Sequence, residues 1–437
     1  MKIPWKKPLI ALLALMFLAQ CIHSALKNRP VEPELVEEQP ILVWYTDPEL
    51  QEYMETAAAE AAASYGIEVT TELVSEVDYI ETIGERSMAE EMTGPDLYIA
   101  SSAQLEKAYL AGLASRLGDD GIVEDYSEKA AHAVTYDGEC IAIPFYIETC
   151  FLLYNQYYTE EAPATIDDIL TYAEAFESDD VTSLVESIFA WNVADVIDNY
   201  MFLGAYTQLG GEDGDDKEQV SMDLQKIEEC LSYYQSLNEY FAIDADTITS
   251  DDVIQDFIDG KTVFVIANVT MLAQLDQAVE DGELPEYPTE RTVTDEDGEE
   301  TTEELSYEPF YAAAVLPNLT SELASQGLSV TNSIVVNPYS ANTEMAEAVA
   351  HYFTETRADE LYSTVGKLPA YRKLAEDPTP VWEAVCAAYD TSAETPKIIE
   401  LSDMWLNLEA TLADIWRGED AGEEIAEFVE LLESRLD

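Results

Sequence analysis

Apolar runs of strand length alternate with stretches of helical periodicity after residue 40. The apolar runs cover 41–46, 67–74 and 94–100, and the helical stretches cover 47–66 and 78–92. Pro48 stands at the first helical position of the first helix and Gly66 follows its last residue, which are typical start and stop signals. This β-α-β-α-β order predicts a parallel sheet with helices packed on its faces.

Polar side chains follow these predicted strands. Asp47 follows the first strand, Asp78 follows the second, and Ser101 and Ser102 follow the third. Ligands of open α/β sheets bind outside the carboxyl ends of the strands. We therefore expect one lip of a binding crevice here. The alternative is that the two serines only cap the helix that begins near Ala103.

The apolar segment 138–155 (GECIAIPFYIETCFLLYN) carries an acidic residue in its middle. Pro144 and the pair Glu148–Thr149 predict two strands with breaks at these points. A carboxylate is costly to bury without a partner. Glu148 therefore needs either a partner or exposure to a cleft.

The remaining pattern alternates between helices and strands. We expect a helix over 163–189, a second helix with Trp191, Asn192 and Asp195 near its start, a strand before Asn268 and Thr270, an exposed hairpin around Asp297–Gly298, strands over 310–317 and 332–338, and a helical tail from Thr379 that contains Trp405. No internal repeat is present in the sequence.

The composition indicates a folded, strongly acidic protein. The chain has 437 residues, which favours two domains, and 47% of them are hydrophobic. Its 90 acidic and 20 basic residues give a formal net charge of −70. Such a surface repels phosphate backbones and anionic lipids, so we expect no nucleic-acid partner and no membrane binding through a basic patch.

The first 25 residues have the pattern of an export signal. Lysines precede the apolar run PLIALLALMFLAQC, which is shorter than the ~20 residues of a spanning helix. The run ends at Cys21 in a sequence that resembles a bacterial lipobox, although Gln20 departs from it. Lipidation of Cys21, cleavage near Ala25 and an uncleaved anchor remain open. Residues 26–40 are rich in Pro and Glu and are expected to form a flexible tether, which places the protein at the outer face of a cell membrane.

Catalytic and metal-binding motifs are not found. Gly260-Lys261-Thr262 lacks the glycine that a phosphate loop requires five residues earlier, where Gln255 stands. The sequence has no GxSxG or HExxH motif and only three histidines. We expect no enzyme activity, no cofactor and no metal. A glycosidase needs only two carboxylates, so that alternative stays open.

Several segments together resemble one family. They are the leader that ends at Cys21, ILVWYTDPE (41–49), GPDLYIASSAQLEKAYLAGLASRL (94–117), AIPFYIETCFLLYN (142–155), AVLPN (314–318) before SVTNSIVVNP (329–338), and LPAYRKL (368–374). Their order and spacing resemble the bacterial extracellular solute-binding proteins of family 1, the maltose/maltodextrin type. These are lipoprotein receptors of ABC importers. The resemblance runs from about Ile41 to the C-terminus.

The resemblance implies an α/β fold of two lobes, the type II periplasmic-binding-protein fold, each lobe a sheet flanked by helices. Three crossings would join the lobes near 146–150, 330–334 and 367–371. The N-terminal lobe would comprise 41–147 plus about 333–368, and the C-terminal lobe about 150–330 plus 370–437. A sugar would be held in the cleft, and the lobes would close about the crossings.

The resemblance also implies the site residues. A glutamate at the first crossing hydrogen-bonds sugar hydroxyls in the family, which accounts for Glu148. Aromatic faces would come from Trp44, Tyr146, Trp191 and Trp405, and polar contacts from Asp47, Asp78, Ser101, Ser102, Asn192, Asp195, Asn268, Thr270 and Asn332. Core packing is the alternative for Trp44 and Trp405, and a favourable charge at a helix start is the alternative for Asp195.

The implied function is that of a non-catalytic, monomeric receptor that delivers a maltodextrin-like oligosaccharide to the permease subunits of an ABC transporter. Two departures bear on the ligand. Residues 100–104 lack the aromatic residue and the Asp-Arg pair of maltose binders, and 268–270 replace a Gly-Pro-Trp sequence. The alternatives are the same fold binding a peptide or polyamine, and a surface glycoside hydrolase.

Overall fold

The computed structural model describes residues 39–90, 93–118, 125–177, 184–285, 287, 290–294, 300–304, 310–374 and 379–436. Contacts divide the chain into Met1–Pro40 and Ile41–Asp437, and the fold below is that of the second unit. The expected signal over 1–25 with Cys21, and nearly all of the tether over 26–40, lie outside the described residues. Among the described helices, none has both the length and the apolar character needed to cross a membrane.

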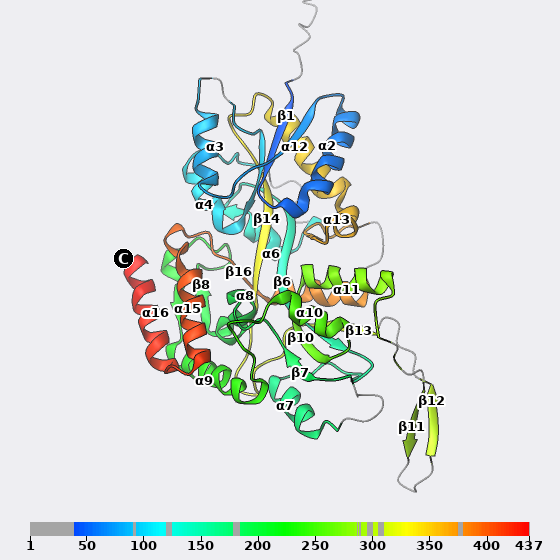
Figure 1. Ribbon diagram of the computed structural model, residues 1–437. Coiled ribbons are helices and arrows are strands. Elements are labelled where there is room, and N and C mark those ends of the chain that lie inside the picture. Colours follow the sequence, from blue (N-terminus) through cyan, green and yellow to red (C-terminus); the bar gives the residue numbers. More distant parts are fainter. Residues whose placement is uncertain are drawn as a thin grey trace, which may run out of the picture. The chain divides into compact units, whose positions relative to one another are not determined.

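The predicted parallel sheet at the start of the unit is confirmed. The strands are β1 (Ile41–Tyr45), β2 (Val69–Leu73) and β3 (Leu97–Ser101), and the helices are α2 (Gln51–Tyr65), α3 (Tyr79–Ser87) and α4 (Ser102–Leu110). β1 pairs in parallel with both β2 and β3 (Figure 1). Gly66 ends α2 in the left-handed conformation, with φ of 72°, as the stop signal predicts.

Two long strands, β6 (Ile143–Asn155) and β14 (Leu328–Val336), extend this sheet, whose order is β2-β1-β3-β14-β6-β10-β7. The predicted breaks in 138–155 are wrong, because β6 is continuous through both Pro144 and Glu148. Pro144 lies beside the register shift between β6 and β14, where a residue without an N–H group is tolerated. Partners on both halves of β6 keep its backbone hydrogen-bonded past Glu148.

The second half of β6 belongs to a different set of strands. It pairs with β10 (Thr262–Asn268) and β13 (Tyr311–Ala314), and β10 pairs in parallel with β7 (Ser187–Ala190) (Figure 1). The helix predicted over 163–189 is therefore wrong in its last part: α7 covers only Ile166–Ala175. The strand β7 is at the end of the sheet order, and only Phe189 of its four residues is buried. So short a segment has no hydrophobic period that distinguishes it from a helix.

The remaining elements complete the two ends of the unit. The helices are α6 (Glu128–Ala133), α8 (Val196–Asn199), α9 (Leu224–Phe241), α10 (Ser250–Ile258), α11 (Val269–Asp281), α12 (Thr343–His351), α13 (Ala358–Val365), α14 (Pro380–Thr391), α15 (Met404–Arg417) and α16 (Ala421–Leu436). The 3₁₀ helices are η1 (Pro48–Leu50), η2 (Tyr200–Phe202), η3 (Gly204–Tyr206), η4 (Lys217–Gln219) and η6 (Ile399–Leu401), and η5 (Tyr352–Thr356) is a short π-helix. The strands are β4 (Thr135–Tyr136), β5 (Glu139–Cys140), β8 (Thr207–Leu209), β9 (Val220–Met222), β11 (Glu290–Thr294), β12 (Glu300–Glu304), β15 (Leu368–Pro369) and β16 (Ala393–Glu394). β11 and β12 form the predicted hairpin.

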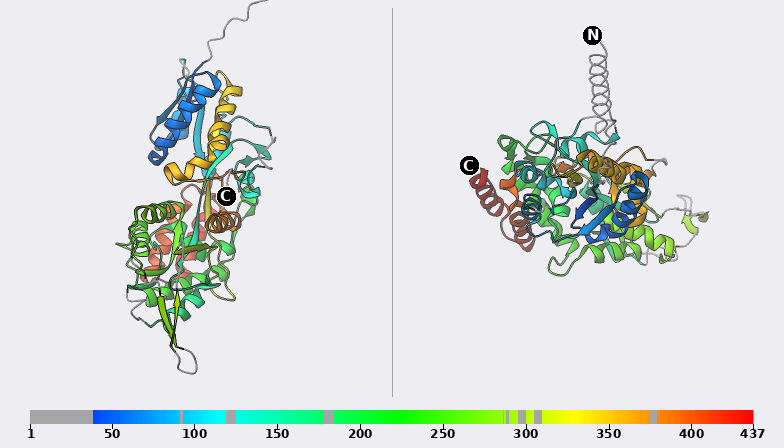
Figure 2. Two further views of the ribbon diagram at one scale, coloured as in Figure 1. Left: turned by 90° about the vertical axis from the view of Figure 1, so that its right-hand side faces the viewer. Right: turned by 90° about the horizontal axis from the view of Figure 1, so that it is seen from above.

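Two hydrophobic cores hold these elements together. One surrounds β1, β3 and the first half of β6 and reaches α10 and α11. The other surrounds β7 and the helices α9, α15 and α16, which lie side by side (Figure 1). The chain ends with α16, at the point marked C in Figure 2. β6 and β14 contribute residues to both cores, so the segment around Glu148 lies where the two cores meet.

Candidate functional site

The three expected crossing segments are hydrogen-bonded neighbours in the sheet. Ile147 of β6 lies opposite Thr331 of β14 on one side and Leu368 of β15 on the other. Glu148 lies opposite Val330. The sheet therefore brings together segments that lie far apart in the sequence and fixes the position of the Glu148 side chain.

A buried ammonium group lies at this junction. The side chain of Lys367 is only 6% exposed, and its Nζ lies 2.7 Å from Glu49 Oε2 and 3.1 Å from Asp47 Oδ2. Glu148 Oε1 is farther away, at 3.8 Å. A buried charge is tolerated only when partners compensate for the loss of water. Glu49 and Asp47, at the start of the first helix, are the principal partners of Lys367.

Two further predicted residues join this network. The phenol of Tyr146 hydrogen-bonds Asp47, and its ring lies 5.7 Å from Lys367 Nζ, a cation–π distance. The side chain of Asn332 hydrogen-bonds Glu148. Asp47, Tyr146, Glu148 and Asn332 are thus brought together around Lys367, as one polar cluster in a largely apolar sheet.

The charges within this network are unevenly compensated. Burial raises the pKa of Glu148, and although Lys367 opposes that effect, Asp47 and Glu49 add to it. Burial lowers the pKa of Lys367, but its hydrogen bond to Glu49 and the charge of Asp47 outweigh this and raise it overall. Lys367 thus stays charged. Of its three carboxylate neighbours, Glu148 is the farthest and is therefore the one that Lys367 stabilises least. Glu148 is also 43% exposed, so it is open to a ligand.

A cavity of about 160 Å³ opens beside Glu148. Four predicted residues line it: Glu148, Asp195, Asn268 and Thr270. Asn268 caps α11 by accepting the Met271 N–H at 3.0 Å, and Asp195 caps α8 by accepting the Ile197 N–H at 2.7 Å. The ends of β10 and of the segment after β7 therefore bring carboxylate and amide groups to the same cavity.

The residues that line this cavity include a buried acid, Asp198, which the sequence places near a helix start but does not assign to the site. Asp198 is 2% exposed, and burial together with the nearby Asp195 raises its pKa to about 7. Cys150 donates its Sγ–H to Asp198 Oδ1 at 3.1 Å. Thr149 and Lys367 also line the cavity. The only sequence signal for Asp198 was a second acidic residue three positions after Asp195.

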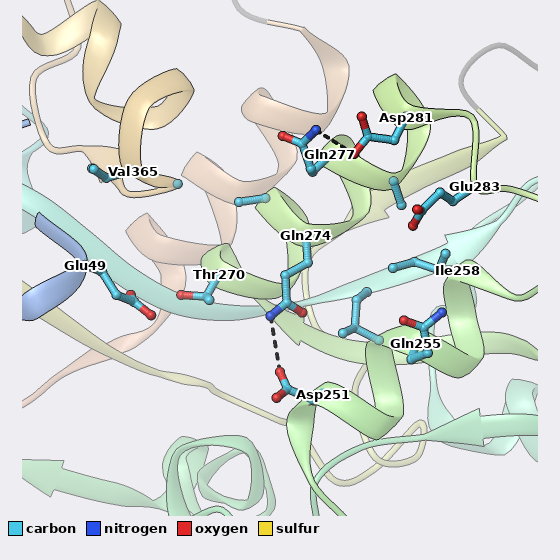
Figure 3. Close-up of a pocket in the computed structure, with 14 residues that line it drawn as sticks. Glu49, Asp251, Gln255, Ile258, Thr270, Gln274, Gln277, Asp281, Glu283 and Val365 are labelled. Carbon is cyan, nitrogen blue, oxygen red and sulfur yellow. Dashed lines mark hydrogen bonds between the residues drawn. The ribbon is translucent and has the colours of Figure 1, made fainter. Parts of the chain in front are cut away.

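A larger cavity of about 620 Å³ adjoins the first, and the two share Thr270. Figure 3 shows its lining: Glu49 and Val365 on one side, and polar and apolar side chains of α10 and α11 on the other. Gln274 donates to Asp251 Oδ1 at 3.2 Å, and Gln277 donates to Asp281 Oδ2 at 2.9 Å. Amide and carboxylate groups of this kind pair well with hydroxyl groups.

A third cavity, larger than these two, lies elsewhere. It has a volume of about 740 Å³ and is lined by Lys129, His132 and Glu394, among others. None of the residues predicted from the sequence contributes to it. We place the candidate site at the two cavities that share Thr270, because the predicted residues converge there.

Other predicted residues serve mainly in packing. Trp44 and Trp191 are 1% and 0% exposed, and their indole N–H groups donate to Glu72 and Asn199. A sugar cannot stack on either ring without displacing this packing. The structure therefore does not bring Trp44 or Trp191 to the surface of the site. Trp405 is half-buried and packs 5.9 Å from the Tyr200 ring.

Four further predicted polar residues lie outside the two cavities. Ser101 caps α4 in a capping box with Gln104, so the capping interpretation holds for Ser101. Ser102 is fully buried. Asn192 donates to Ser250 Oγ at 3.1 Å, and Asp78 is exposed at the start of α3 in the left-handed conformation. No group of three or more His, Cys, Asp or Glu in the described ranges is placed to hold a metal ion.

The chain belongs to the family described as bacterial extracellular solute-binding protein, whose sequence profile matches residues 56–387. Membership of this extracellular family indicates an exported protein. The maltodextrin-binding protein MdxE of Bacillus subtilis (strain 168) is 24% identical over 311 residues, which are 68% of this chain and 66% of MdxE. A maltotriose-binding protein of Pyrococcus abyssi is 28% identical over 179 residues, or 40% of this chain and 37% of that protein. The matches thus span just under two thirds, and just over one third, of these relatives.

Solved structures confirm the two-lobe α/β fold class. A Staphylococcus aureus extracellular solute-binding protein in complex with maltose has a TM-score of 0.69 at 16% identity, over 91% of this chain and 97% of that one. A Thermus thermophilus maltotriose-binding protein bound with maltotriose has a TM-score of 0.66 at 16% identity, over 91% and 100% of the two chains. At these identities the likeness establishes the fold alone.

Proposed function

We propose that the chain is a non-catalytic receptor that binds a carbohydrate, a maltodextrin-like oligosaccharide, and delivers it to the permease of an ABC transporter. The observation that carries this proposal is Glu148: a carboxylate inside an apolar strand, 43% exposed, that opens to a cavity lined by carboxylate and amide groups. The relatives named above, which bind maltodextrin or maltotriose by name, support the ligand class.

The site is suited to binding hydroxyl groups. Glu148 accepts hydrogen bonds from a sugar, and as an ionised acceptor it forms stronger bonds than a neutral group does. Asn268 and Thr270, which line the same cavity, contribute neutral donors and acceptors. The larger cavity extends the site toward α10 and α11, so that a chain of several sugar rings fits along the two cavities together.

Closure of the site uses the three paired crossing segments as a hinge. The proposed lobes are 41–147 with about 333–368, and about 150–330 with 370–437. A hinge of this kind encloses the ligand and excludes water, which strengthens every polar contact inside. Lys367 links Glu49 and Asp47 of the first helix to Glu148 of the crossing strand, so it couples the proposed N-terminal lobe to the hinge.

The proposed cellular setting follows from the leader. The segment 1–25 directs export, Cys21 carries a lipid anchor, and residues 26–40 hold the folded unit away from the membrane. The chain acts as a monomer that docks on its permease subunits. Metabolic labelling with a fatty acid tests the anchor: the label is expected on the native chain and lost in Cys21→Ala, and a native chain without label contradicts it.

A thermal-shift panel tests the proposed function. It includes maltose, maltotriose, longer maltodextrins, other oligosaccharides, short peptides and polyamines. A ligand at about 100 times its Kd adds ~2.7 kcal/mol to the folded state and raises the melting temperature. We expect a rise with an oligosaccharide that Glu148→Gln reduces by about half or more and that Glu239→Gln, on the exposed face of α9, leaves in place. A rise with peptides or polyamines alone, or steady hydrolysis of a glycoside, contradicts the proposal.

A further inference from the structure

Two of the residues that line the 160 Å³ cavity each have a buried polar atom with no hydrogen-bond partner within the described part of the chain. The two atoms are Asp198 Oδ2 and Thr149 Oγ1, and each residue is 2% exposed. Both residues line the cavity together with Glu148. Buried polar atoms in native folds are nearly always paired. Two of them among the residues that line one small cavity indicate a ligand group that supplies missing hydrogen bonds there.

The charge of the cavity points to a cation. Glu148, Asp195 and Asp198 line it, and Lys367 is the only basic residue among the described ones that does so. Lys367 Nζ lies 2.7 Å from Glu49, which does not line this cavity, and 3.8 Å from Glu148. Its charge is therefore largely committed outside the cavity. A carboxylate as deeply buried as Asp198 is stable in its ionised form only beside a positive group.

An ammonium group fits this arrangement better than a metal ion does. The described residues include no group of three or more acidic, His or Cys side chains placed to hold a metal. An ammonium group needs only a few oxygen acceptors, which Asp198 Oδ2, Thr149 Oγ1 and Glu148 supply. The cavity of about 160 Å³ has room for the volume of about five waters at ~30 Å³ each, enough for the amino-bearing edge of one ring.

We propose that this cavity binds a protonated amino group of the ligand, and that the carbohydrate recognised by the chain is an amino sugar. The identification of the ligand as a sugar rests on the proposed function, whereas the ammonium subsite rests on the cavity itself. The ammonium group donates to Asp198 Oδ2 and Thr149 Oγ1, while Glu148 contributes a second negative charge. Burial raises the pKa of both carboxyl groups, and a bound cation reverses that effect.

Isothermal titration calorimetry with the purified full chain tests the proposal. The probes are a glucosamine trisaccharide, its N-acetylated counterpart with the same linkage, maltotriose and spermidine. We expect the free amine to bind at least about tenfold more tightly than the N-acetylated form, because acetylation removes the charge. Asp198→Asn, which keeps the shape of the side chain, is expected to abolish this preference. Asp359→Asn, at an exposed position of α13, is expected to retain it.

Thr149→Val provides a second variant that leaves every carboxylate in place. It is expected to weaken the binding of the free amine more than the binding of the N-acetylated sugar. If Asp198→Asn does not fold, this variant tests the ammonium subsite instead. Equal or tighter binding of the N-acetylated sugar or of maltotriose overturns the ammonium subsite but leaves the carbohydrate receptor intact. Binding of spermidine alone, lost in Asp198→Asn, supports the ammonium subsite and overturns the carbohydrate receptor. No binding of any probe overturns both.

Discussion

Replacing Asp198 by asparagine is expected to change how the stability of the protein depends on pH. The Asp198 carboxyl group is buried, and its pKa is raised from an ordinary value of 3.8 to about 7 by burial and by Asp195. The folded state therefore holds this proton more tightly than the unfolded state does. The group's contribution to stability is greatest at low pH and is lost as the pH rises from about 4 through about 7.

The size of the effect follows from the two pKa values. Each difference of one between them corresponds to about 1.4 kcal/mol, so the full cost of ionising Asp198 in the folded state is on the order of 4 kcal/mol. Between about pH 5 and about pH 8, this group alone lowers the free energy of unfolding by about 2–3 kcal/mol. An asparagine side chain carries no charge at either pH, so the Asp198→Asn variant escapes this loss.

Urea unfolding at the two pH values measures the difference. The wild type is expected to lose about 2–3 kcal/mol more than Asp198→Asn on going from about pH 5 to about pH 8. Asp359→Asn serves as the matched control, because it removes an exposed carboxylate from the same highly acidic chain. If Asp198→Asn, like Asp359→Asn, shows the same pH dependence of the free energy of unfolding as the wild type, the pKa of Asp198 is not raised in the folded state and the prediction is refuted.

Three further predictions concern separate parts of the fold. Lys367→Met removes a buried ammonium group that pairs with the partly exposed carboxylates of Asp47 and Glu49, and it is expected to lower the free energy of unfolding by about 1–3 kcal/mol; no loss of stability in urea would refute its structural role. Thr165→Ala removes the capping box with Asp168 and should cost about 1 kcal/mol, whereas Thr165→Ser should cost much less. The hydrogen bond that the His351 ring donates to Glu355 raises the pKa of His351, so an NMR titration should place this pKa above 6.5 in the wild type and lower in Glu355→Gln. The linked stability is present below pH 6.5 and is lost as the pH rises through the raised value.

The sequence predicts the first part of the fold well because its local signals are strong. Pro48 and Gly66 mark the ends of the first helical segment, and strands separated by such helices form parallel sheets. The strand β7 is not predicted, since four residues inside a helical pattern carry no local sign of their pairing with β10. Whether such a segment forms a strand depends on its pairing with a strand that is distant in the sequence.

The candidate site shows the same limit. Glu148 is recognisable because a carboxylate in an apolar run needs an explanation, and the structure gives it a cavity. The sequence leaves Trp44 open between a ligand contact and core packing, because a tryptophan near a strand end looks the same in both cases; in the structure it is buried. Asp198 and Lys367 are missed because their roles depend on neighbours from distant segments, such as Cys150 and Glu49.

The central claim is that the cavity beside Glu148 binds a carbohydrate, and calorimetry on the wild type and Glu148→Gln tests it most directly. The account predicts one binding event per chain with an oligosaccharide, and a Kd at least about tenfold weaker in Glu148→Gln, because a hydrogen bond to a charged group contributes about 1.5–3 kcal/mol. Equal affinity in the two proteins, or no heat with any oligosaccharide, would contradict the account.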